Sequence, residues 1–88
     1  MSFDFLDFKI VKIHRLLDGN RIKAFVDLGI NDALLIKGLR VINGEKGLFV
    51  SMPQERGKNL RWYEKVCCLN KEIRGQINQK VLEAYNKE

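Results

Sequence analysis

The sequence is poor in the residues that build catalytic, metal and disulfide sites. Its 88 residues include one histidine, one proline and two cysteines. The cysteines, Cys67 and Cys68, are neighbours and make a poor disulfide framework. With His14 they supply three ligands, whereas a zinc site needs about four. The acidic residues form no pair suited to acid–base chemistry, and no glycine-containing turn matches a phosphate-binding loop. We therefore predict no catalytic residue, metal, cofactor or small-molecule substrate, and a protein that is not an enzyme.

Long apolar runs are also missing. No segment approaches the ~18 to 20 apolar residues of a membrane span, and the N-terminus MSFDFLDFK has neither the basic start nor the apolar stretch of a signal peptide. We expect a cytoplasmic protein with no membrane partner. The apolar share of 45% is enough for one domain, residues 1–88, with one modest core. Because so small a core gives limited stability, pairing with a second copy is favoured.

Alternating apolar and polar residues predict an antiparallel sheet in the first part of the chain. Ile10 and Val11 stand side by side and break the alternation, which predicts a bulge. Asp18-Gly19-Asn20 is a strong turn signal, so residues 8–30 are interpreted as one hairpin. Two further strands are predicted at residues 33–42 and at residues 48–52, where Pro53 ends the last of them.

The second part of the chain is predicted to end in a helix. Residues 54–61 have no apolar periodicity and are interpreted as a loop, and residues 62–66 as a short fifth strand. From residue 70 onward apolar side chains recur at helical spacing, and Asn70 can cap the first turn. These predictions give an α+β fold: a small antiparallel β-sheet of four to five strands followed by one C-terminal α-helix.

Basic residues are concentrated after residue 54. The net charge is +5, and residues 55–80 carry seven Lys and Arg against three Asp and Glu. Basic side chains neutralise phosphates, and an exposed aromatic ring offers a surface for base stacking. We expect Tyr63 to be exposed and Trp62 to be buried, because a small domain needs its largest apolar side chain inside. The candidate nucleic-acid-binding residues are Arg56, Lys58, Arg61, Tyr63, Lys65, Lys71 and Arg74.

Two other interpretations of these residues stay open. The basic excess can serve solubility alone, in a protein-interaction module that acts on a division or regulatory partner. For Cys67 and Cys68 we expect opposite orientations in an extended backbone, one thiol buried and one exposed. Core packing of a thiol is favoured over a reactive thiol.

Three stretches resemble one known family. RIKAFVDL, LRVINGEKGLFVSMP and LNKEIRGQINQKVLEAY are similar to the sporulation stage V protein G (SpoVG) family, and the resemblance covers residues 8–86. It implies an antiparallel sheet followed by a helix, homodimers formed by pairing of sheet strands, and DNA binding, with RNA binding in some members. It further implies bacterial regulators of gene expression linked to cell division, sporulation and virulence.

The resemblance also assigns residues. The family's basic positions after the Met-Pro pair and along the final helix correspond to Arg56 and Arg74. The chain departs from the family at Glu55, where a second basic residue is usual, and at Cys67-Cys68, where His-Pro is usual.

Overall fold

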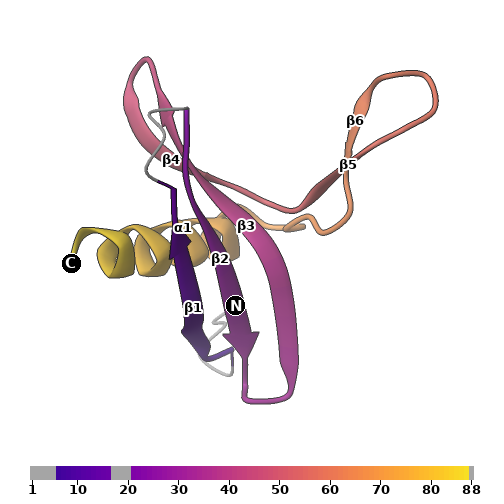
Figure 1. Ribbon diagram of the computed structural model, residues 1–88. Helices are drawn as coiled ribbons and strands as arrows, with labels where there is room; N and C mark the ends of the chain where they lie inside the picture. The colour runs from indigo at the N-terminus through magenta and orange to yellow at the C-terminus, as the bar shows by residue number, and fades with distance from the viewer. Residues whose placement is uncertain (1–5, 17–20, 88) are drawn as a thin grey trace.

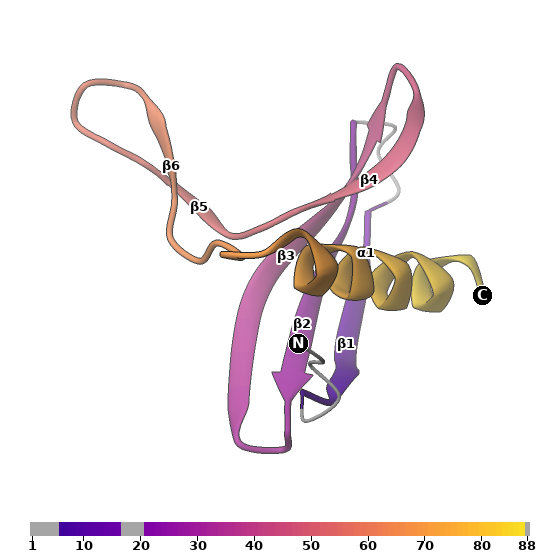
Figure 2. The same cartoon turned by 180° about the vertical axis from the view of Figure 1, so that it is seen from behind.

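The computed structural model describes residues 6–16 and 21–87. Strands β1 to β4 form an antiparallel sheet in sequence order, and β5 and β6 form a separate hairpin. Helix α1 crosses one face of the four-stranded sheet (Figures 1 and 2), which confirms the predicted α+β class. Neither the length nor the hydropathy of this helix allows it to cross a membrane. The elements are β1 (Phe8–Arg15), β2 (Ile22–Ile30), β3 (Leu34–Gly44), β4 (Gly47–Ser51), β5 (Gln54–Arg56), β6 (Trp62–Glu64) and α1 (Lys71–Asn86).

The hairpin predicted for residues 8–30 is confirmed by the pairing of β1 with β2. The register shifts between Ile10 and Lys12, at the predicted bulge, so that Val11 is the additional residue. The predicted turn at Asp18-Gly19-Asn20 lies outside the described residues. The alternating pattern of β2 places one face of the strand in the core, as predicted, because every second residue from Ala24 to Leu28 is completely buried.

Strand β3 is longer than the predicted residues 33–42. It runs on to Gly44, which pairs with Gly47, so the β3–β4 turn contains only two central residues. Gly47 has a φ of 119°, a conformation that L side chains rarely adopt. Gly38, with a φ of 87°, lies where β3 shifts register against β2. Gly38 therefore marks an irregularity in the strand.

Helix α1 closes the core over the sheet. The backbone N–H of Ile73 donates to Asn70 Oδ1 at 2.9 Å, which confirms Asn70 as the N-cap. Ile77 and Val81 are buried among the sheet residues. Near the helix C-terminus, the Arg15 guanidinium donates to the carbonyl oxygen of Tyr85 and lies 4.5 Å from the centre of the Tyr85 ring. A cation on the last carbonyl groups also complements the helix dipole.

The β5–β6 hairpin, residues 54–64, projects away from the sheet and helix and is called the arm (Figures 1 and 2). The loop predicted for residues 54–61 is correct only for residues 57–61, because residues 54–56 form a strand. At the base of the arm, the backbone N–H of Lys65 donates to the carbonyl oxygen of Pro53 at 2.8 Å. At the tip, the N–H of Gly57 donates to the Arg61 carbonyl at 2.8 Å. Backbone hydrogen bonds, rather than burial of apolar side chains, therefore hold the two strands of the arm together.

Candidate nucleic-acid interface

Three cations project from the arm. Arg56 pairs with Trp62 across the two strands, and Lys58 and Arg61 lie in the loop that joins them. All three cationic side chains are exposed, and none forms an ion pair with an acidic side chain of the described residues. The arm therefore presents three positive charges to solvent on a narrow two-stranded ribbon.

The other predicted cations have different surroundings. Lys65 Nζ lies 3.0 Å from Glu55 Oε2, and Arg74 Nη1 lies 4.0 Å from Glu64 Oε2. The first pair joins two residues at the base of the arm, and the second joins the arm to helix α1. Because the side chains are largely exposed, such pairs contribute little stability and exchange readily for another anion. Lys71 is exposed at the first residue of α1.

Tyr63 is exposed, as predicted, with 48% of its surface accessible. Its hydroxyl accepts a hydrogen bond from Asn59 Nδ2 at 2.7 Å. The Tyr63 ring packs over Gly57, where an added Cβ would lie only 2.7 Å from the ring. Asn59 Oδ1 also accepts from the N–H of Arg61 at 3.1 Å. These contacts fix the loop that carries two of the three arm cations.

The prediction that Trp62 is buried is wrong. The arm holds this side chain away from the helix-covered core, and 55% of its surface is accessible. The Cζ atom of Arg40, on β3, lies 5.7 Å from the Trp62 ring centre and 5.8 Å from that of Phe25. A cation this close to a ring face is attracted by the ring's negative face. Sequence reasoning missed Arg40, whose only signal was a basic residue between the apolar Leu39 and Val41.

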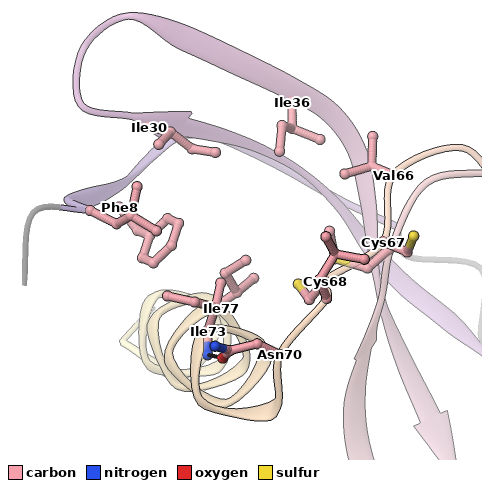
Figure 3. Close-up of a pocket in the computed structure, with 12 residues that line it drawn as sticks. Phe8, Ile30, Ile36, Val66, Cys67, Cys68, Asn70, Ile73 and Ile77 are labelled. Atoms are coloured by element: carbon pink, nitrogen blue, oxygen red, sulfur yellow. Dashed lines mark hydrogen bonds between the residues drawn. The ribbon is translucent and has the colours of Figure 1, made fainter. Parts of the chain in front are cut away.

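An apolar pocket of 370 Å³ lies between the start of α1 and one end of the sheet (Figure 3). Phe8, Ile36 and Ile73 are among its lining residues. Figure 3 shows the two thiols pointing in different directions, with the Cys68 thiol on the pocket side. Cys67 is exposed and Cys68 is half-buried against the core. The predicted divergence of the thiols is therefore observed.

Alkylation should distinguish the two cysteines. Burial raises the pKa of the Cys68 thiol above its usual value, and Arg74 offsets this effect only in part. Since the thiolate is the nucleophile, iodoacetamide at neutral pH should label exposed Cys67 faster than Cys68. Labelling of Cys68 should increase only as the pH is raised. Peptide mass spectrometry over a time course measures both rates, and equal rates at neutral pH would contradict the geometry.

Comparison with known proteins agrees with this fold. The SpoVG family model matches residues 6–87. A septation protein SpoVG of Desulforudis audaxviator is 36% identical over 75 residues, which cover 85% of each chain. That of Archaeoglobus fulgidus is 33% identical and covers 89% of this chain and 92% of the relative. That of Fusobacterium nucleatum is 37% identical and covers 85% of this chain and 83% of the relative. The chain belongs to the SpoVG family.

Proposed function

We propose that this protein is a regulator that binds DNA, and also RNA, through the arm and the start of α1. The observation that carries the proposal is the set of three exposed cations on the arm, Arg56, Lys58 and Arg61, which have no acidic partner within residues 6–16 and 21–87. Phosphates supply most of the attraction between a protein and a nucleic acid, because each phosphate that a Lys or Arg neutralises releases a counterion from the nucleic acid. The relatives are named septation proteins, which supports the link to cell division, and we propose that the regulated genes serve cell division or sporulation.

The shape of the arm suits a duplex. A two-stranded β-ribbon is narrow enough to enter the major groove of B-DNA, and the arm is such a ribbon. Lys71 and Arg74, at the start of α1, lie beyond the base of the arm and can reach the flanking phosphates. Contacts to the phosphates of the nucleic acid set the orientation and affinity of the complex, whereas contacts to the bases set its sequence preference.

We further propose a homodimer formed by pairing of sheet strands. The bulge at Val11 interrupts the outer edge of β1, whereas β4 is regular, and among the described strands β4 pairs only with β3. Bulges hinder the pairing of edge strands, so β4 is the favoured edge. Sedimentation at micromolar concentration should give about twice the chain mass of 10.3 kDa. A single species at the monomer mass would contradict the dimer.

A salt series tests nucleic-acid binding. A labelled DNA duplex and an RNA of the same length are titrated with the protein at several salt concentrations. Affinity should fall linearly on a log–log plot, and the double variant Arg56→Ala/Arg61→Ala should flatten the slope by about 0.9 for each lost phosphate contact. The control Lys37→Ala/Lys46→Ala removes the same charge away from the arm and should retain most of the slope.

The two functional hypotheses predict different results in this titration. If neither nucleic acid binds at low salt, the proposal is wrong, and a protein-interaction module becomes the better hypothesis. If both double variants lose affinity equally, general charge rather than the arm determines binding.

A further inference from the structure

The face of the sheet opposite α1 carries a row of side chains that crosses all four strands. His14 pairs with Phe25, Phe25 with Arg40, and Arg40 with Ser51. Each of these residues alternates with a residue directed toward the core, so the row lies on the side that the helix leaves uncovered, which faces the viewer in Figure 1. We call this side the open face. Its described outward residues include Lys9, Val11, Lys12, His14, Phe25, Asp27, Arg40, Ile42, Phe49 and Ser51.

The open face is basic. Lys9, Lys12 and Arg40 carry positive charge, and Asp27 is the one acidic residue among those outward positions. This charge lies on strands β1 and β3, apart from the cations of the arm. A polyanion is therefore attracted to a second surface of the same molecule.

The open face also presents aromatic rings. Phe49 has 42% of its surface accessible, Phe25 is half-buried in the centre of the row, and Trp62 reaches over Arg40 from the arm. The Arg40 guanidinium lies close to two of these rings, and its buried Nε atom has no hydrogen-bond partner among the described residues. Aromatic surfaces next to cations are the combination that single-stranded nucleic acids recognise, with stacked bases and neutralised phosphates.

We propose that the open face binds single-stranded nucleic acid. Bases stack on Phe25, Phe49 and Trp62, while Lys9, Lys12 and Arg40 contact the phosphates. Phe25 and Phe49 lie on strands that are two apart, a separation of about 10 Å or more, so neighbouring nucleotides can reach both rings. The site includes Trp62 of the arm but otherwise lies on the sheet. Its ligand also differs, because stacking requires bases that are not paired.

A second copy of the chain is the competing occupant of this face. Two copies related by symmetry would bring the cations of both open faces toward each other. Like charges in a desolvated interface oppose association, and Asp27 alone does not balance three cations. Charge complementarity therefore favours the polyanion.

The experiment uses Trp62, the one tryptophan of the chain, as an internal probe. Oligo-dT and oligo-U of about 12 nucleotides, a length within the range of single-strand sites, are titrated into the full-length protein. Stacking should quench Trp62 fluorescence, and the anisotropy of the labelled oligonucleotides should give the same affinity. Phe49→Leu and, separately, Phe25→Leu should weaken single-strand binding about tenfold, because each removes one stacking ring and keeps apolar volume.

Controls separate this site from the arm. Leu34→Ala, an exposed aliphatic position at the far end of β3, should leave single-strand affinity unchanged. Circular dichroism and thermal melting show that each variant is folded, and exposed Phe49 gives a second variant should Phe25→Leu not fold. Duplex affinity should be retained in both phenylalanine variants and reduced in Arg56→Ala/Arg61→Ala.

The outcomes are distinct. Weaker single-strand binding with unchanged duplex binding in the phenylalanine variants supports the open face. Failure of the wild type to bind either oligonucleotide at low salt overturns the open-face proposal even if duplex DNA binds. Unchanged single-strand affinity in both folded variants overturns it as well. If Phe49→Leu alters the sedimenting mass but not single-strand affinity, the face is an interface between copies.

Discussion

Replacing Glu55 with lysine is expected to tighten duplex binding by roughly one to two orders of magnitude at 0.1 M salt, since each added phosphate contact contributes about eightfold there. Glu55 stands on the arm beside the cations that we assign to phosphate binding, and its Oε2 lies 3.0 Å from Lys65 Nζ. The substitution removes a repulsive charge, adds an attractive one and releases Lys65. The number of phosphate contacts should therefore rise by one or two.

The measurement is the same salt series with the duplex. Affinity at 0.1 M salt should rise and the log–log slope should become steeper. Glu45→Lys, in the β3–β4 turn, makes the same change in net charge away from the arm and is the matched control. If Glu45→Lys tightens binding as much as Glu55→Lys does, the arm has no special role. Weaker binding in Glu55→Lys would show that the Glu55–Lys65 pair orients the arm.

Replacing Ile77 with alanine should destabilise the fold by about 2 to 5 kcal/mol. Ile77 is 3% exposed and packs into the core between α1 and the sheet. The loss combines apolar contacts with the cavity that remains, and for a chain of this length it should lower the melting temperature by about 10 °C or more. Urea unfolding followed by circular dichroism, at one fixed protein concentration, measures the change.

Leu69→Ala is the matched control for Ile77→Ala. Leu69 is also aliphatic and lines the same apolar pocket, yet it is 98% exposed. Its replacement should change the free energy of unfolding by no more than about 0.5 kcal/mol. A loss at Leu69 as large as that at Ile77 would contradict this prediction, because it would mean that Leu69 is buried in solution.

The sheet and helix could be predicted because burial shapes their sequences. The period-2 pattern around Val26 and the helical spacing of Ile77 and Val81 follow from packing on one core. The arm could not be predicted in the same way, because it packs on no core and is held by hydrogen bonds within its own turn. Trp62 was misplaced for this reason: the prediction assumed that every large apolar residue of a small domain joins its core.

The candidate site was predictable in composition but not in arrangement. The seven proposed residues follow from charge and aromatic content, whereas their partners depend on cross-strand register in a three-residue strand. Nothing in the sequence indicates that Glu55 pairs with Lys65 or that Glu64 lies near Arg74. Arg40 is harder still to predict as a site residue. It contacts Trp62 only because the arm brings that ring over a strand more than twenty residues earlier in the chain.

The backbone hydrogen bond between Pro53 and Lys65 makes the arm a removable module. Lys65 N lies 2.8 Å from Pro53 O, so the residues that flank the arm are already close together. A short turn can join them with little change in loop-closure entropy. Arms of different length and sequence can thus be exchanged on a constant core. A new arm would have to replace two contacts with the rest of the chain, Trp62 over Arg40 of the sheet and Glu64 beside Arg74 of the helix.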